Sequence, residues 1–109
     1  MLTIFKYPLE RAPEQFIEMP APAILLSVAE QYGLLALWAI VDPSKPALTR
    51  RIVIKETGRH VDRDLPSCFL GTVLLNEGRY VVHVFCDMAW ERERSSALLG
   101  LMGGYGDGI

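Results

Sequence analysis

The segment AILLSVAEQYGLLALWAIVD, residues 23–42, indicates the fold class. Two apolar runs, Ala23–Glu30 and Leu34–Asp42, flank the tripeptide Gln31-Tyr32-Gly33. A glycine between two such runs is typical of a tight β-hairpin, because glycine adopts the positive φ of hairpin turns without steric cost. We therefore expect two antiparallel strands joined by this turn.

The same pattern extends to both sides of this segment. A second hairpin is expected where Asn76-Glu77-Gly78-Arg79 separates the apolar runs Cys68–Leu75 and Tyr80–Asp87. Three further strands are expected, and they are Leu2–Tyr7, Gln15–Met19 and Arg50–Glu56. About seven strands with short connections favour an antiparallel sandwich or a small barrel, so the expected fold class is mainly β.

The pattern changes after Asp87. Apolar residues at helical spacing predict one C-terminal α-helix over Met88–Met102, and they are Trp90, Ala97, Leu98 and Leu101. Asp87 is suited to cap the first turn of this helix, and Gly103-Gly104 to end it. We expect a single domain in two parts, a β domain at residues 1–87 and a helix with a glycine-rich tail at 88–109.

Length and composition exclude several classes of protein. The chain has 109 residues, of which 50% are hydrophobic and 22% charged, as in a folded domain rather than a disordered chain. A net charge of −2 argues against binding of nucleic-acid polymers, which needs an excess of Lys and Arg. The apolar runs are far shorter than the roughly 20 residues that span a bilayer, and the first residues lack the layout of a secretory signal. We expect a cytoplasmic protein without membrane contact.

Cys68 and Cys86 each lie within an apolar run. Free cysteine behaves as a small hydrophobic residue, so we expect two buried free thiols, as is usual in cytosolic proteins. Whether the two pair depends on the register of their strands, which the sequence does not show. The sequence has no Cys-x-x-Cys motif, which excludes a zinc ribbon and a thioredoxin-type site.

The polar residues form no catalytic pattern. His60, Asp62 and Asp64 alternate as on one face of an extended segment, but without a second ligand cluster they favour a solvated loop over a metal site. His83 lies between valines and shares strand parity with Phe85, which favours a hydrogen-bonded core or interface histidine. Motifs of nucleophilic and phosphate-transfer enzymes are absent from the sequence. We expect a non-enzymatic protein without metal or cofactor.

Basic residues concentrate between Arg50 and Arg63. This stretch carries five positive charges against Glu56 and Asp62, hence +3 in a chain that is −2 overall. The guanidinium group of arginine donates two parallel hydrogen bonds to a phosphate, so this stretch suits a small phosphate-bearing anion. The hydroxyl of Thr57 could form a further hydrogen bond with the same anion. The alternative interpretation is a strand whose arginines face solvent. The aromatic side chains that would stack on a base, unless they lie in the core, are Trp38, Tyr80, Trp90 and Tyr105.

A series of short motifs occurs in order along residues 4–86. The motifs are Lys6-Tyr7-Pro8-Leu9, Met19-Pro20, Ile24–Val28, Leu37–Pro43, Thr57-Gly58-Arg59-His60, Gly71-Thr72-Val73 and His83-Val84-Phe85. In this order they resemble a family of short uncharacterised proteins encoded by bacteriophages and prophages. The resemblance implies a small protein that acts in the cytoplasm of the infected bacterial host. Some phage proteins of this kind are counter-defence sponges, which bind cyclic nucleotide immune signals without cleaving them.

The preferred hypothesis is a homo-oligomeric sponge for a phosphate-bearing small ligand, in particular a cyclic nucleotide. An oligomer is expected because short sheets leave edges that need covering. The expected ligand-binding residues are Lys6, Arg51 and Arg59 for phosphate, Thr57 and His60 for hydrogen bonds, and Trp38 or Trp90 for stacking. Two alternatives stay open. One is a protein-binding inhibitor of a host factor, which would use a strand edge or the helix at 90–102, and the other is a minor structural phage component.

Overall fold

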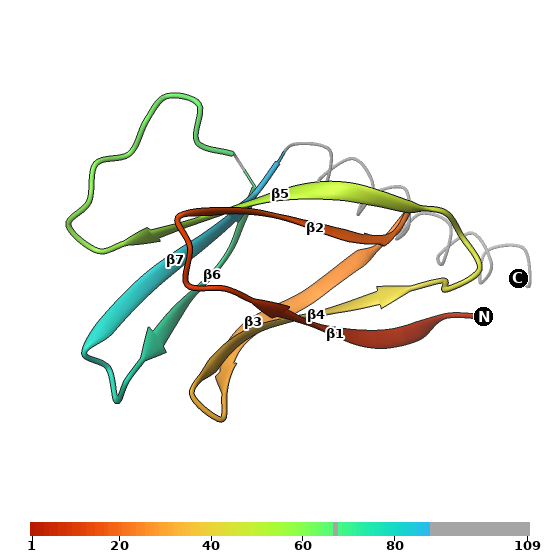
Figure 1. Ribbon diagram of the computed structural model, residues 1–109, viewed down its shortest axis with the longest axis horizontal. Coiled ribbons are helices and arrows are strands. Elements are labelled where there is room, and N and C mark those ends of the chain that lie inside the picture. Colours follow the sequence, from red (N-terminus) through yellow and green to blue (C-terminus); the bar gives the residue numbers. More distant parts are fainter. Residues whose placement is uncertain (67, 88–109) are drawn as a thin grey trace, which may run out of the picture.

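The structure is a computed structural model, and it describes residues 1–66 and 68–87 (Figure 1). Within these residues the chain forms strands and no helix. The strands are β1 (Thr3–Leu9), β2 (Glu14–Pro20), β3 (Ile24–Gln31), β4 (Leu34–Val41), β5 (Ala47–Glu56), β6 (Cys68–Leu75) and β7 (Tyr80–Cys86). The expected mainly β fold of seven strands is confirmed. The expected C-terminal helix, with Trp90 in it, lies outside the described residues.

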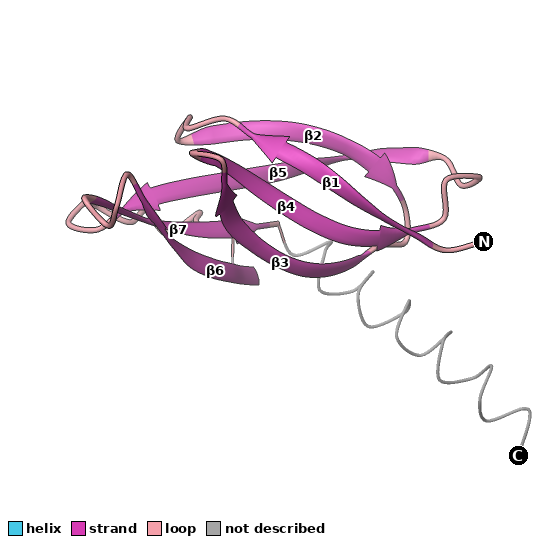
Figure 2. Ribbon diagram, turned by 90° about the horizontal axis from the view of Figure 1, so that it is seen from below, coloured by secondary structure: helices cyan, strands magenta, loops and turns pink. Residues whose placement is uncertain are grey.

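The strands form two antiparallel sheets (Figure 2). The three-stranded sheet has the order β1-β4-β3, and the four-stranded sheet has the order β2-β5-β7-β6. Both expected hairpins occur, since β3 pairs with β4 and β6 pairs with β7. The chain passes to the other sheet after β1, β2 and β4, whereas the long loop after β5 returns to the same sheet. Two separate sheets agree with the sandwich rather than with one closed barrel.

Both hairpin turns use left-handed backbone conformations. In the β3–β4 turn, Tyr32 and Gly33 have φ values of 53° and 80°. The β6–β7 turn has positive φ at Asn76 (51°), Glu77 (57°) and Gly78 (84°). Successive positive φ values match the right-handed twist of the flanking strands, so these turns fix the register of each hairpin.

The hydrophobic core lies between the two sheets. Alternate residues of β4 are buried in it, and they are Leu35, Leu37, Ala39 and Val41. From the facing sheet, β5 contributes Ile52 and Ile54, whose side chains point to the same face because successive residues of a strand alternate between its two faces. Cys68 and Cys86 also lie in this core, and no disulfide joins them.

At one side of the molecule, the edge strands β3 and β6 touch. A Cβ added to Gly71 of β6 would lie 2.9 Å from Cγ2 of Val28 in β3. Gly71 follows a shift of register within β6, a position at which strands bend. The missing side chain therefore lets the two sheets approach closely here.

The described part of the chain has no helix of the length and apolarity needed to cross a membrane.

Candidate functional site

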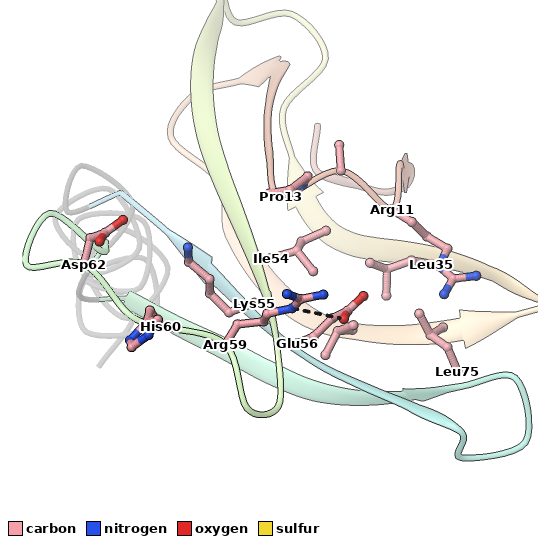
Figure 3. Close-up of a pocket in the computed structure, with 12 residues that line it drawn as sticks. Arg11, Pro13, Leu35, Ile54, Lys55, Glu56, Arg59, His60, Asp62 and Leu75 are labelled. Atoms are coloured by element: carbon pink, nitrogen blue, oxygen red, sulfur yellow. Dashed lines mark ion pairs between the residues drawn. The ribbon is translucent and has the colours of Figure 1, made fainter.

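A cleft of about 490 Å³ opens at the end of the molecule where the β1–β2 and β5–β6 loops lie (Figure 3). Its floor is apolar because core residues of both sheets reach it. These buried residues are Leu35 of β4, Ile54 of β5, Leu75 of β6 and Val82 of β7. Ala12 and Pro13 of the β1–β2 loop also line the cleft. Its volume is within the range of small-molecule sites, about 300–1,000 Å³.

The rim of the cleft is charged, with an excess of positive groups. The cationic residues are Arg11, Lys55 and Arg59, joined by His60, and the acidic residues are Glu56 and Asp62. Arg59 Nε lies 3.8 Å from Glu56 Oε2, and both side chains are exposed, so this pair leaves guanidinium N–H groups available to a ligand. Among residues 1–66 and 68–87, Arg11 and Lys55 take part in no ion pair. The arrangement suits an anion with an apolar or aromatic body.

Arg11 is a rim residue that no sequence motif marks. Its guanidinium carbon lies 4.9 Å from the centre of the Tyr80 ring, a cation–π contact that orients the side chain. Tyr80 is expected from the sequence as a stacking surface for a base, and in the structure it lies against Arg11. The sequence gives no sign of this contact, because Arg11 and Tyr80 are far apart along the chain.

Arg51 lies outside the cleft, on the outer face of the four-stranded sheet. Its Nε donates to Glu14 Oε2 at 2.6 Å, its Nη1 donates to the backbone carbonyl of Asp64 at 3.3 Å, and its Nη2 lies 3.8 Å from Asp64 Oδ2. The hydrogen bond with Glu14 raises the pKa of the Arg51 guanidinium. Arg51 thus binds other segments of the protein. It lines a second cavity of about 300 Å³, which we call the outer hollow.

Thr57 begins the β5–β6 loop, and its hydroxyl contacts His83 rather than the cleft. Thr57 Oγ1 lies 2.9 Å from His83 Nε2, and Thr72 Oγ1 lies 2.9 Å from His83 Nδ1. The Thr57 amide also donates to the carbonyl of Val81 at 3.0 Å. The expected hydrogen bonding of His83 is confirmed, but His83 lies on the outer face of the four-stranded sheet and not in the core.

Lys6 and Trp38 are cross-strand neighbours on the outer face of the three-stranded sheet. Lys6 Nζ donates to Gln31 Oε1 at 2.9 Å, and Trp38 is half-buried. Neither residue lines the cleft. Of the expected ligand-binding residues within the described ranges, the cleft therefore brings together Arg59 and His60.

His60, Asp62 and Asp64 are exposed, and the structure separates their contacts. His60 and Asp62 line the cleft, whereas Asp64 contacts Arg51. In the part of the chain that the structure describes, no three His, Cys, Asp or Glu side chains are grouped as they would be around a metal ion.

Residues 1–94 match the model of the family described as Domain of unknown function (DUF7352), and the chain belongs to this family. No curated protein matches the chain, and no solved structure matches it. The family match covers all seven strands, and so it includes every residue that lines the cleft.

Proposed function

We propose that this member of the DUF7352 family binds a small phosphate-bearing ligand in the cleft and sequesters it without chemical change. The observation that carries the proposal is an apolar floor below a cationic rim in one cleft. Leu35 and Ile54 offer hydrocarbon to a flat ring, and Arg11 and Arg59 offer guanidinium groups to a phosphate (Figure 3). A nucleotide combines both parts.

A cyclic nucleotide is the ligand that we favour. Each of its phosphates is esterified twice and carries one negative charge. The rim carries three cations and the two carboxylates of Glu56 and Asp62. This small excess of positive charge suits a ligand with one or two negative charges better than a triphosphate. The resemblance of the ordered motifs to phage and prophage proteins supports the setting we propose, a counter-defence sponge in the cytoplasm of an infected bacterium.

Titration calorimetry with a panel of cyclic mononucleotides and dinucleotides tests the proposal. We expect the wild-type protein to bind one of them and to release it unchanged. Arg59→Ala and Arg11→Ala are each expected to weaken binding about tenfold, the usual effect of losing a charge-assisted hydrogen bond. Arg79→Ala is the matched control, because Arg79 is an exposed arginine of the β6–β7 turn that does not line the cleft.

Two results would overturn the proposed function. One is a wild-type protein that binds no member of the panel. The other is an Arg79→Ala variant that loses as much affinity as Arg59→Ala, since binding would then depend on overall charge and not on the cleft.

Exposed apolar side chains support an oligomer and favour a second candidate function, the capture of a host protein. Ile4 and Leu34 lie on the outer face of the three-stranded sheet with 59% and 67% of their surface exposed. Apolar residues left open to solvent on one face are typical of protein interfaces. Native mass spectrometry of the wild type and of Leu34→Lys distinguishes the two roles. A loss of subunits indicates a self-contact, whereas an unchanged subunit count with loss of a captured host protein favours the second function.

A further inference from the structure

The β5–β6 loop is fastened to the outer face of the four-stranded sheet at two points. Its first residue, Thr57, is held by His83 and by the carbonyl of Val81. Further along, Asp64 is held by Arg51, through both the backbone carbonyl and the side chain of the aspartate. Residues 58–63 lie between the two points, so both ends of this stretch are fixed.

Burial beneath the loop shows how closely it lies against the sheet. Val53 is on the outer face of β5, yet only 4% of its surface is exposed. It lines the outer hollow together with Pro13 and Leu65, the residue after Asp64. The β1–β2 and β5–β6 loops thus cover this part of the face. Arg51 connects the two loops. It contacts Asp64 in the β5–β6 loop and Glu14, the first residue of β2 after the β1–β2 loop.

The stretch between the two points carries part of the rim of the cleft. Arg59, His60 and Asp62 all line the cleft, and Asp62 also lines the outer hollow. Asp64 lies two residues beyond Asp62. Because each residue adds at most about 3.6 Å of reach, the contact of Asp64 with Arg51 restricts where Asp62 and its neighbours lie.

We propose that Arg51 is a positioning residue, which holds the β5–β6 loop through Asp64 so that Arg59 and His60 face an anion in the cleft. This inference rests on the proposed function. A ligand binds with full affinity only to molecules whose loop is in place, so the apparent affinity scales with that fraction of molecules. Arg51 thus changes the affinity without touching the ligand, unlike the phosphate contact expected from the sequence.

Two aspartates of the same loop separate positioning from direct contact. Asp64→Asn removes the carboxylate that Arg51 holds, whereas Asp62→Asn removes the same charge without changing the contact of Arg51. Loss of a negative charge near an anion site by itself strengthens anion binding. A positioning role for Arg51 therefore predicts opposite effects, stronger binding by Asp62→Asn and weaker binding by Asp64→Asn. Direct contact predicts that both variants bind more strongly, because Asp64 would no longer compete for the guanidinium.

The experiment combines titration calorimetry, with cyclic AMP and cyclic di-AMP as probes, and hydrogen exchange of the full chain without ligand. We expect Asp64→Asn to lower the affinity about twofold to fivefold, the range for an exposed charge pair, because the hydrogen bond from Arg51 Nη1 to the backbone carbonyl of residue 64 remains. It is also expected to speed amide exchange at residues 58–63, which Asp62→Asn leaves unchanged. Arg51→Lys keeps the charge but not the guanidinium fork, so it is expected to behave like Asp64→Asn.

Stronger binding by Asp64→Asn overturns the positioning role. Exchange at residues 58–63 that equals the wild type in both Asp64→Asn and Arg51→Lys overturns it as well. The exchange measurement needs no ligand and therefore decides the inference separately. A wild-type protein that binds no probe counts against the proposed function instead.

Discussion

Cys68 and Cys86 lie directly opposite each other on β6 and β7, and both thiols are buried with no disulfide between them. This antiparallel register brings two Cα atoms to about 4.5–5.5 Å, a separation that a disulfide can span. Burial disfavours formation of a disulfide here, because it raises the pKa of the Cys86 thiol. The negative charge of Asp87 raises this pKa further. The thiolate that starts oxidation is therefore scarce. The expected pair of buried free thiols is confirmed, in a register that the sequence leaves open.

We expect the folded protein to resist thiol reagents. Ellman's reagent is expected to find no reactive thiol in the native state and both Cys68 and Cys86 after unfolding in guanidinium without reductant. The single variants Cys68→Ala and Cys86→Ala are controls, since each leaves one thiol that reacts only after unfolding. Rapid reaction of the native protein, or a missing thiol in denaturant, contradicts the prediction.

The protein is expected to lose stability at alkaline pH. Burial raises the pKa of the Cys86 thiol above its ordinary value of 9.0 and the pKa of the Tyr7 hydroxyl above 10.0. Both groups therefore keep their protons in the folded state while the unfolded chain ionises. Their contribution to the free energy of unfolding is complete below about pH 9 and is lost as the pH rises further. Ionisation of the Cys86 thiol in the unfolded chain lowers the free energy of unfolding by at most about 1.4 kcal/mol per pH unit.

Urea unfolding at pH values between about 8 and 10.5 measures this slope. We expect Cys86→Ala to flatten the slope between about pH 9 and 10, where the thiol dominates. A variant that follows the wild-type slope throughout would show that another group causes the loss.

Gly71→Ala is expected to lower the free energy of unfolding by about 1–3 kcal/mol, the usual cost of overpacking. The new Cβ would lie 2.9 Å from Val28 Cγ2, and valine is stiff at χ1, so relief requires β3 and β6 to move apart. Val28→Ala removes the clashing methyl group. The double variant is therefore expected to lose less stability than the two single variants together, as measured by urea unfolding. Additive losses contradict the clash.

Local signals predict most of the fold, because hairpins join strands that are neighbours in the chain. The turn at Gly33 and the turn at Gly78 both occur where the sequence places them. Tyr32 also adopts a positive φ, which is uncommon for tyrosine and is not predicted from the sequence. The pairing of β1 with β4 and of β2 with β5 joins distant segments. It depends on which faces are buried together, and no local pattern contains that information.

The candidate site is predictable only in part for the same reason. Of the ligand-binding residues expected in the basic stretch at residues 50–63, Arg59 and His60 line the cleft. Alternation along β5 sends Arg51 to the outer face, where it meets Glu14 of β2. Arg11 joins the rim because the β1–β2 loop lies at the same end of the molecule. Charge along the chain thus identifies a loop, whereas strand pairing decides which charges share a cavity.

Each ring nitrogen of His83 lies 2.9 Å from a threonine hydroxyl, so the tautomer of His83 decides which partner donates in each hydrogen bond. Thr57 Oγ1 also lies 3.4 Å from the carbonyl oxygen of Val81, which only accepts, and we expect the single hydroxyl proton of Thr57 to be directed there. The Thr57 oxygen then accepts from His83 Nε2–H, and His83 Nδ1 accepts from the hydroxyl of Thr72. We therefore predict that the neutral imidazole carries its proton on Nε2.

Heteronuclear NMR of the ring nitrogens at alkaline pH, where histidine is neutral, identifies the tautomer. We expect an Nε2–H signal in the wild type and a weaker tautomer preference in Thr72→Val, which loses the donor to Nδ1. Thr57 is also the first point at which the β5–β6 loop is fastened. Thr57→Val is therefore expected to speed exchange at residues 58–63, whereas Thr72→Val leaves it unchanged. A proton on Nδ1 would reverse the direction of both hydrogen bonds and overturn the assignment.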